Sequence, residues 1–372
     1  MRMPRPAINL LSLVIAVLFC IGLATSCKKG DGSSLLNSTT GTGTKPIAAI
    51  KLTGTVVAGA GKKLTLSVSA LGTASVQKDV TLSTISAGLD MDASGLLPAS
   101  MIGSSGFIFT GDSVIYNGIT ITNKTGIVTH GDMLNATKLY GNLAYATVAF
   151  GDGSGPQITT KRIPFFLYYK AVDQSGNPVP AHGADLFGIA HGYSNGNKLI
   201  ASPLTYLPVS GDLISGFKLS MVNFNISQGA CILTIGLTPA DLEASNGFNL
   251  HPLSVLAGGA GYANYINGTI VYNGTSLSGP VAFSTGYTSA SVIQDPKYTG
   301  TGYSALATGS TVRIVTSNGF NYIYTISNSA YTTVIENPAS SGENRSIFGI
   351  DFFTQNEFLV DYTNHQIGLK NL

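Results

Sequence analysis

The fold is decided by a short stretch that occurs twice: residues 80–84 read VTLST, and residues 281–285 read VAFST. Each copy is an apolar run that ends in Ser-Thr. Downstream of each copy lies a second matching element, LFGI at residues 186–189 and IFGI at residues 347–350. Because the same two motifs recur in the same order, the sequence predicts a duplicated structural unit.

The segments around these motifs have the patterns of β-strands. Apolar and polar residues alternate from Leu64 to Ala70, which is typical of a half-buried strand. Asn318-Gly319 and Asn273-Gly274 are turn pairs suited to β-hairpins. The best helix signal is Thr238-Pro239-Ala240-Asp241-Leu242, and Gly247 keeps that helix short. We therefore expect an all-β chain with a few short helices.

The N-terminus has the pattern of an export signal. Arg2 and Arg5 precede an apolar run at residues 10–23, which is too short to span a bilayer as a mature helix. Small residues then lead into Cys27, which resembles a bacterial lipobox. We expect a signal peptide at residues 1–26 and acylation of Cys27, so that the lipid bilayer is one partner of the mature chain.

The segment after the signal predicts where the protein resides. Residues 27–46 are rich in Gly, Ser and Thr, as in a flexible tether. Lys28 stands where an aspartate would retain many lipoproteins in the inner membrane, so we expect a lipid anchor in the outer membrane of a bacterial envelope. Which membrane face it takes, periplasmic or surface, is left open. Beyond the tether we expect an N-terminal lobe at residues 47–198 and a C-terminal lobe at 199–372.

Composition and charge exclude several classes of protein. Only 10% of the 372 residues are charged, which is too few for a coiled coil or a charged disordered chain. Arg2 and Arg5 lie in the signal, so Lys+Arg falls from 20 to 18 in the mature chain and equals the 18 acids. With no basic excess to neutralise phosphates, we expect no nucleic-acid partner.

The sequence gives no pattern for a metal site, a cofactor site or a disulfide. Its five histidines are scattered, with none at the short spacings of a zinc site. Cys231 is the one thiol left after the signal and the lipidated residue, and it lies in the apolar run CILTIGL. We therefore expect no metal and no cofactor, and we expect Cys231 to pack as a small hydrophobic side chain.

The order of these segments resembles the pepsin-like aspartic peptidases across nearly the whole of residues 50–372. In that family each lobe has an apolar strand ending in D-T-G and a later apolar-apolar-Gly element that crosses it. The stretches ILTIGLTPADL, NYINGTIVYNGTSLSGPVAFSTG and IFGIDFFTQNEFLVDYTNHQIGLKN are similar to successive parts of the second lobe. LAYATVAFGD resembles the strand that leaves the flap. The resemblance implies a bilobal fold with a central cleft.

The same resemblance implies that both catalytic aspartates are missing. The positions that match D-T-G read Ser83-Thr84-Ile85 and Ser284-Thr285-Gly286. An aspartic peptidase needs two carboxylates that share a proton, and a serine hydroxyl is not ionised near neutral pH. We therefore expect no catalytic residue at these degenerate positions, and a pseudo-peptidase.

Other positions indicate which parts of the family's site remain. Thr84 and Thr285 are retained, and in the family these threonines brace the two lobes against each other. Ile85 replaces the first glycine and adds bulk in the cleft, whereas Gly286 is kept. If residues 129–148 form the flap, His130 stands where the family has a tyrosine.

Three functional classes stay open. The first is a non-catalytic protein that binds a peptide, a protein or a glycan in the cleft or at its rim, as the acid-free xylanase inhibitors of cereals bind proteins. The second is an aspartic-type endopeptidase with an unconventional site, and the third is a structural envelope lipoprotein. Asp90 and Asp92 could be imagined as substitute acids, but their position beside Ser94-Gly95 favours solvated loop residues. We favour the binding protein.

Overall fold

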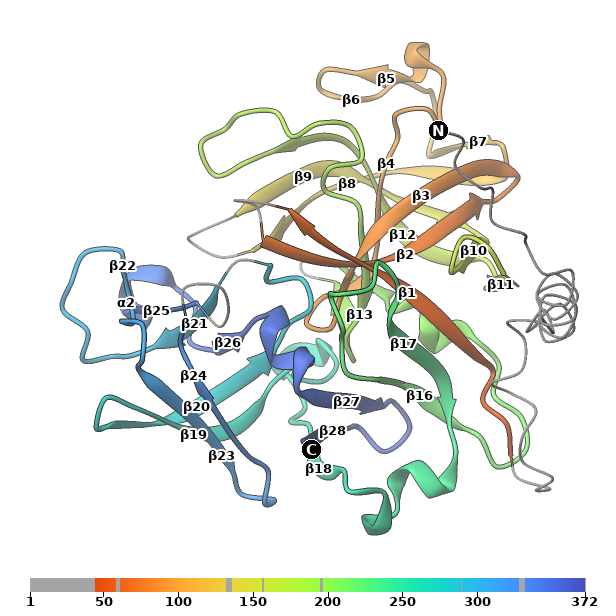
Figure 1. The fold of residues 1–372 in the computed structure, drawn as a ribbon. Helices are drawn as coiled ribbons and strands as arrows, with labels where there is room; N and C mark the ends of the chain where they lie inside the picture. Colours follow the sequence, from red (N-terminus) through yellow and green to blue (C-terminus); the bar gives the residue numbers. More distant parts are fainter. Residues whose placement is uncertain are drawn as a thin grey trace, which may run out of the picture. The chain divides into compact units, whose positions relative to one another are not determined.

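The computed structural model describes most of the chain beyond its N-terminal segment. The described ranges are residues 44–57, 61–131, 136–155, 157–194, 197–288, 290–327 and 332–371. The predicted signal peptide, Cys27 and most of the tether lie outside them. Residues 44–372 form one compact unit, which is mostly β-structure (Figure 1).

The larger sheet contains most of the first half of the chain and both ends of the second. Its strands follow in the order β18 (Asn249–Pro252), β28 (Gln366–Asn371), β27 (Asn356–Asp361), β16 (Ile214–Leu219), β17 (Gln228–Leu237), β1 (Ala48–Val57), β2 (Gly61–Leu71), β3 (Ala74–Ser83), β13 (Leu186–Ile189), β4 (Ala87–Asp92), β12 (Ile163–Val172), β9 (Thr137–Ala146), β8 (Ile119–His130) and β7 (Ser113–Tyr116). β10 (Val148–Gly151) pairs with β2 and with β11 (Ile158–Thr159). β1 lies between β2 and β17, so it joins the two halves through backbone hydrogen bonds.

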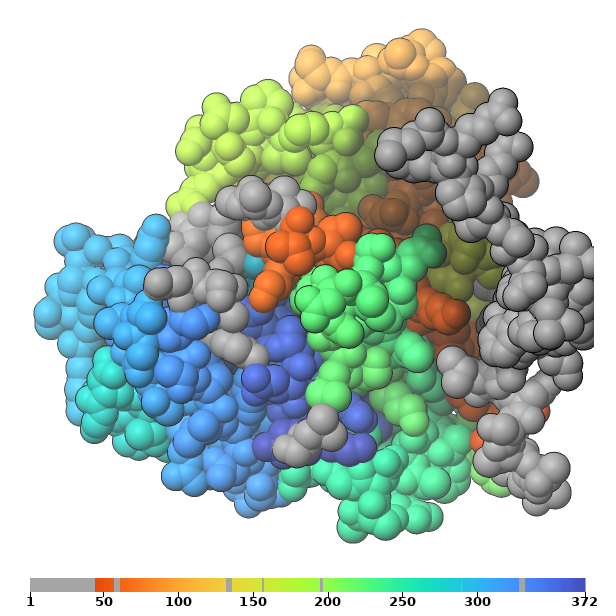
Figure 2. Space-filling view, viewed as in Figure 1, coloured from red at the N-terminus to blue at the C-terminus, as the bar shows by residue number. Residues whose placement is uncertain are grey.

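The second sheet lies wholly within the C-terminal half. Its order is β22 (Tyr303–Ala305), β25 (Thr333–Glu336), β21 (Ser291–Gln294), β26 (Ser346–Phe348), β20 (Thr275–Phe283), β19 (Ile266–Tyr272), β23 (Thr311–Thr316) and β24 (Asn321–Thr325). On the face drawn in Figure 2, the blue residues of this half and the yellow-green residues of the first half occupy separate areas, with orange and green residues between them.

The remaining elements are short. Two small hairpins pair β5 (Ile102–Gly103) with β6 (Gly106–Phe107) and β14 (Tyr193–Ser194) with β15 (Asn197–Ala201). Among the described residues, the α-helix is α2 (Pro338–Ser341), and the 3-10 helices span Ala99–Met101, Pro203–Tyr206, Pro239–Leu242, Ala244–Asn246, Ala257–Gly259 and Ile350–Thr354. None of the helices formed by the described residues has the length and hydropathy needed to cross a bilayer.

The duplicated motifs occupy equivalent places in the two halves. In the first, β13 runs parallel to β3, with Gly188 opposite Ser83. In the second, β26 runs parallel to β20, with Phe348 opposite Phe283. The repeat found in the sequence is therefore a repeat of strand pairing. In each half, the Ser-Thr loop follows a strand that pairs in parallel with the strand of the second motif.

The predicted hairpin turns and the short helix are confirmed. β19 and β20 are joined at Asn273-Gly274, whose φ angles of 44° and 76° match a turn that needs positive φ at both positions. β23 and β24 are joined through the segment that contains Asn318-Gly319. The helix Pro239–Leu242 is a 3-10 helix, and Asp241 accepts hydrogen bonds from the backbone N–H and the hydroxyl of Thr238.

One expectation about burial is wrong. The alternation in β2 predicts a polar face in water, but Thr65, Ser67 and Ser69 are all buried. β10 pairs with part of β2, and the hydroxyl of Ser69 donates to the carbonyl of Ala149 in that strand. Ser69 therefore has a partner in a strand about 80 residues further along the chain, which the local pattern does not reveal.

Cys231 in β17 packs as expected. Its side chain is 1% exposed and its thiol donates to the carbonyl oxygen of Ser220. Burial raises the pKa of this thiol to about 12, so it stays protonated at neutral pH.

Candidate functional site

The two Ser-Thr loops meet at the base of a cleft. Ser83 ends β3 and Ser284 directly follows β20. Both serines line the same cavity of about 660 Å³. Gly286 shows how close they are, because a Cβ atom added there would lie 3.2 Å from Ser83 Oγ and 3.6 Å from Ser284 Oγ. The duplicated strands therefore bring two hydroxyl groups, 201 residues apart in sequence, to one point.

Backbone amides hold each hydroxyl oxygen in place. Ser83 Oγ accepts a hydrogen bond of 3.2 Å from the N–H of Ser86. Ser284 Oγ accepts two bonds of 3.2 Å, from the N–H groups of Gly286 and Tyr287. The side chains are 2% and 0% exposed, respectively. Each loop thus folds around its serine oxygen.

The neighbouring threonines connect the loops. Thr84 Oγ1 donates to the carbonyl oxygen of Phe283 at 2.6 Å and accepts from the N–H of Thr285 at 3.1 Å. Thr285 Oγ1 donates to the carbonyl oxygen of Leu82 at 2.7 Å. Both threonines are buried. Three hydrogen bonds therefore tie the loop of one half to the loop of the other.

The cleft above the serines is lined by a mixture of aromatic, polar and apolar side chains. Tyrosines are prominent, and they are Tyr193, Tyr262, Tyr265 and Tyr287. The charged side chains among the described lining residues are Lys198, Arg345 and Glu343. With the histidines neutral, two cations face one acid, so the lining has a formal charge of +1.

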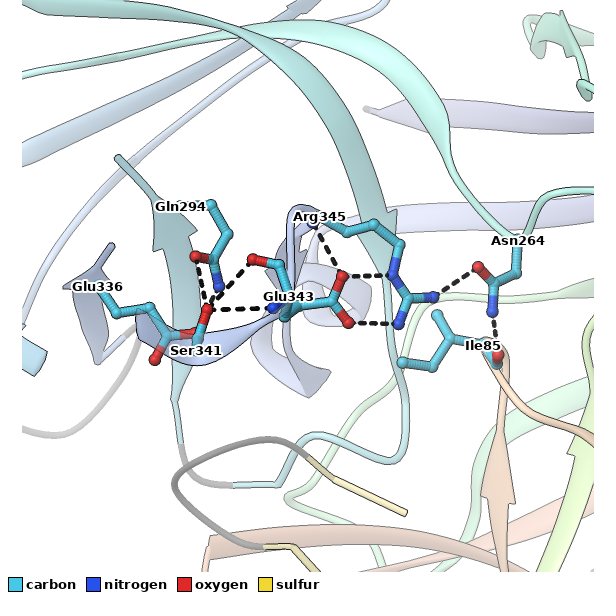
Figure 3. Close-up of polar contacts among 7 residues, drawn as sticks. All are labelled: Ile85, Asn264, Gln294, Glu336, Ser341, Glu343 and Arg345. Carbon is cyan, nitrogen blue, oxygen red and sulfur yellow. Dashed lines mark hydrogen bonds and ion pairs between the residues drawn. The ribbon is translucent and has the colours of Figure 1, made fainter. Parts of the chain in front are cut away.

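A chain of polar contacts crosses one side of the cleft (Figure 3). Arg345 donates from Nε and Nη2 to both carboxylate oxygens of Glu343, at 2.9 and 2.6 Å. It also donates from Nη1 to Asn264 Oδ1 at 2.7 Å, and Asn264 Nδ2 donates to the carbonyl oxygen of Ile85. The backbone of the Ile85 loop is therefore held by residues of the second half.

The outer end of this network is anchored in the second sheet. The N–H of Glu343 donates to Ser341 Oγ at 3.2 Å, and that hydroxyl lies 3.2 Å from Gln294 Oε1, to which it donates. Gln294 Nε2 donates to Glu336, so the network reaches β21 and β25 (Figure 3). Burial opposes the charge of both ionised groups, yet their pairing lowers the pKa of Glu343 and raises the pKa of Arg345. Both carboxylate oxygens of Glu343 are thus bound by Arg345.

His130 lies at the mouth of the predicted flap. It ends β8, opposite Thr137 of β9, and it lines both the main cavity and a smaller hollow of about 230 Å³. The tip of the hairpin, residues 132–135, lies outside the described residues. His130 Nε2 is 2.8 Å from Asp90 Oδ2, an ion-pair distance at which the ring N–H is not aligned for a hydrogen bond.

The expectation that Asp90 and Asp92 are solvated loop acids is wrong. Both lie in β4 and are buried, at 0% and 6% exposed. Asp92 accepts from the backbone N–H groups of Ser94 and His182. The loop carrying His182 covers β4, and nothing in the local sequence around Ser94-Gly95 predicts that cover.

A third acid belongs to the same buried group. Asp185 accepts hydrogen bonds from the hydroxyl of Tyr168 at 2.7 Å and from the N–H of Asp92 at 2.8 Å, and it lies 2.7 Å from His182 Nδ1. Burial raises the pKa of Asp185 despite these bonds. Its partners are all part of the first half, so this group stabilises the wall of the smaller hollow.

Sequence reasoning missed an aromatic stack at the edge of the cleft. His191 Nε2 lies 2.7 Å from His365 Nδ1, and Tyr262 stacks on the His365 ring with a centroid distance of 3.8 Å. The three residues come from segments far apart in sequence. Burial, followed by the charge of His365, lowers the pKa of His191 to about 4. The imidazole of His191 is therefore neutral at neutral pH.

The structure offers no metal site among the residues that it describes. Within those ranges, no group of three or more His, Cys, Asp or Glu side chains is placed to hold an ion. The two histidines of the aromatic stack contact each other and a tyrosine, and so do not converge on a common point with an acid.

Comparison with known proteins supports the fold. The chain resembles the crystal structure of an aspartic proteinase from Irpex lacteus with a TM-score of 0.55 and 17% sequence identity, covering 87% of this chain and 97% of that one. No family model and no curated protein matches the sequence. The chain therefore has the all-β, pepsin-like fold, and its cleft lies between the two halves that carry the Ser-Thr loops.

Proposed function

We propose that this protein is a non-catalytic, pepsin-like lipoprotein of the bacterial envelope that binds a peptide, a protein or a glycan in its cleft. The observation that carries the proposal is that the two Ser-Thr loops keep their connecting hydrogen bonds but have serines where the catalytic acids would be. Their braces are intact, yet the oxygens at the centre are the hydroxyls of Ser83 and Ser284. A peptidase of this fold needs two carboxylates there to activate water.

Two acids near the cleft, Glu343 and Asp185, do not replace that pair. Glu343 is bound by Arg345 through two hydrogen bonds, and Asp185 is bound by Tyr168 and His182. A cavity of about 660 Å³ is in the size range of small-ligand and peptide sites. Retention of the cleft together with loss of the acids favours binding over hydrolysis.

One observation favours a second candidate, a hydrolase with an unconventional site. His130 lines the same cavity as Ser83 and contacts the buried Asp90, which is the order of groups used to activate a serine nucleophile. Labelling with a fluorophosphonate separates the candidates, because an activated serine is modified and an ordinary serine hydroxyl is not.

Capture of partners from an envelope extract tests the binding proposal. We expect the full chain in detergent to retain a defined ligand or partner. Leu256→Arg should abolish capture, because Leu256 lines the cleft and a long cation there would fill it. Leu199→Arg is the matched control: Leu199 is 50% exposed and is not among the lining residues. Equal capture by both variants would exclude the cleft as the binding site.

The lipid anchor has its own test. We expect a fatty-acid probe to label the wild-type chain and to leave Cys27→Ser unlabelled, because the thiol of Cys27 is the predicted acceptor of the lipid. Envelope fractionation of the same two chains should place only the wild type in the membrane. Labelling of both chains to the same extent would refute the anchor.

A further inference from the structure

The hydrogen-bonding capacity of the serine pair is only half used. Every hydrogen bond that Ser83 and Ser284 make through their hydroxyls to described residues is an accepted one, from the N–H groups of Ser86, Gly286 and Tyr287. A serine hydroxyl carries one donor as well as its acceptor sites. Neither O–H donates to another described residue, although the side chains are 2% and 0% exposed.

An unused donor at such a depth has a strong preference for a partner. Leaving a buried hydroxyl unpaired costs about 1–3 kcal/mol. The three backbone N–H groups that point at the serine oxygens also polarise them, which makes each O–H a better donor. Both oxygens lie within 4 Å of the position that a Gly286 Cβ would take, so the two hydroxyls are near enough for one small ligand group, such as a carboxylate with its two oxygens, to contact both.

We propose that Ser83 and Ser284 form a binding subsite for a hydrogen-bond acceptor, the oxygen of a carboxylate or of a carbonyl group. This inference rests on the proposed function and names the chemistry that the cleft recognises. It reverses the polarity of the site of an aspartic peptidase, in which two acids accept or share protons. Here two O–H groups, each supported by backbone amides, both donate.

The charges around the cleft are compatible with such an oxygen. Lys198 and Arg345 face a single lining acid, Glu343, and that acid is paired with Arg345. Asp90 is directed to His130. The subsite therefore places no unpaired carboxylate of the described residues against an incoming acceptor.

Small acceptors test the subsite without knowledge of the natural ligand. The full chain in detergent, labelled with ¹⁵N at glycine and tyrosine, is titrated with sodium acetate or with acetamide, and sodium chloride serves as the ionic control. We expect saturable shifts of the Gly286 and Tyr287 amide signals, because these amides donate to Ser284 Oγ. Saturation by acetate alone identifies a carboxylate subsite, and saturation by acetamide as well identifies a carbonyl subsite. Absence of saturation with both compounds would overturn the proposal.

Variants show whether the probe binds through the donor hydroxyls of the two serines or only enters the open cleft. Ser83→Ala with Ser284→Ala should weaken binding of the acetate or acetamide probe at least tenfold, because both donors are lost. Ser284→Asn and Ser284→Asp have the same shape, but only the first keeps a donor. At neutral pH the Asp variant should bind acetate at least tenfold more weakly than the Asn variant. Equal binding by these two variants would contradict the proposal, even if the cleft captures a partner from the envelope.

Discussion

In the first half of the chain β13 leads into His191, and in the second half β26 leads into Phe352 at the matching position of the repeat. Phe352 is buried among aromatic rings, with its ring centroid 4.1 Å from that of Phe283. His191 is half-buried, stacks on Tyr262 and contacts a second histidine.

The difference extends to the strands beside the two loops. β4, in the first half, carries the buried acids Asp90 and Asp92, next to His130 and His182. In the second half, Phe283, which directly precedes Ser284, packs in an apolar cluster of phenylalanines and tyrosines. The two halves thus differ at these positions: aromatic rings pack beside the loop of Ser284, whereas buried acids and histidines lie beside the loop of Ser83. Among the described residues of the second half, the charged groups that line the cleft are Arg345 and Glu343, which pair with each other.

The largest expected effect on stability comes from the aromatic core around Phe352. Phe352→Ala should lower the free energy of unfolding by about 3–5 kcal/mol, because it opens a cavity in a core where Phe352 is 2% exposed. His191→Ala, at the matching position, should cost roughly 1–2 kcal/mol, because the imidazole is only half-buried. Denaturant-induced unfolding of the full chain in detergent measures both values. Equal losses would mean that the two positions are packed alike.

The two threonines that connect the loops should contribute unequally to the free energy of unfolding. Thr84→Val removes two hydrogen bonds and leaves two buried backbone groups unpaired, so we expect a loss of roughly 2–4 kcal/mol. Thr285→Val removes one donated bond and leaves the carbonyl of Leu82 unpaired, for roughly 1–3 kcal/mol. Valine matches threonine in shape, so the comparison isolates the hydroxyl. A larger loss for the second variant would contradict this arrangement.

The parts of the structure that the sequence predicts are those encoded over short distances. The turns at Asn273-Gly274 and Asn318-Gly319 need only their own residues, and both hairpins form. The repeat of Ser-Thr and apolar-Gly motifs is also local, and it predicts a duplicated unit. The structure adds that the two motifs of each half pair in parallel, β3 with β13 and β20 with β26.

The burial of polar side chains and the contacts between distant residues could not be predicted, because both depend on segments far away in the sequence. The alternation in β2 is correct as a strand pattern, but its polar side chains are buried, and Ser69 bonds to Ala149 in the distant strand β10. Asp90 is buried in a strand that lies between β12 and β13, with His130 of the distant strand β8 against its carboxylate. The contacts from Arg345 to Asn264 and from His191 to His365 join residues 81 and 174 positions apart, and no spacing rule predicts such pairs.

The smallest effect concerns the pH dependence that His191 contributes to stability. Burial lowers the pKa of His191 to about 4, whereas an unfolded histidine has a pKa of about 6.5. The unfolded chain therefore binds the proton first as the pH falls, so the contribution of His191 is complete above about pH 6.5 and is lost progressively towards pH 4. Its size is on the order of 1–2 kcal/mol after allowance for solvent screening.

A variant isolates this contribution from that of other titrating groups. The free energy of unfolding is measured at pH 7.5 and at pH 4.5 for the wild type and for His191→Phe, which keeps an aromatic ring against Tyr262. We expect the loss of stability on acidification to be smaller in the variant. An unchanged pH dependence would show that His191 is not the group responsible.

The central claim, a peptidase fold without peptidase chemistry, is tested most directly by hydrolysis of a denatured protein substrate between pH 3 and pH 8. The full chain is assayed with and without a transition-state-mimicking inhibitor of aspartic peptidases and a fluorophosphonate. Loss of general acid–base catalysis alone typically costs 10²–10⁴-fold in rate, and here both acids of the pair are serines. We predict no inhibitor-sensitive cleavage by the wild type. We also predict little or none after Ser83→Asp with Ser284→Asp unless Ile85→Gly is added, because Ile85 lines the cleft. Cleavage by the unmodified chain that either inhibitor abolishes would contradict the account.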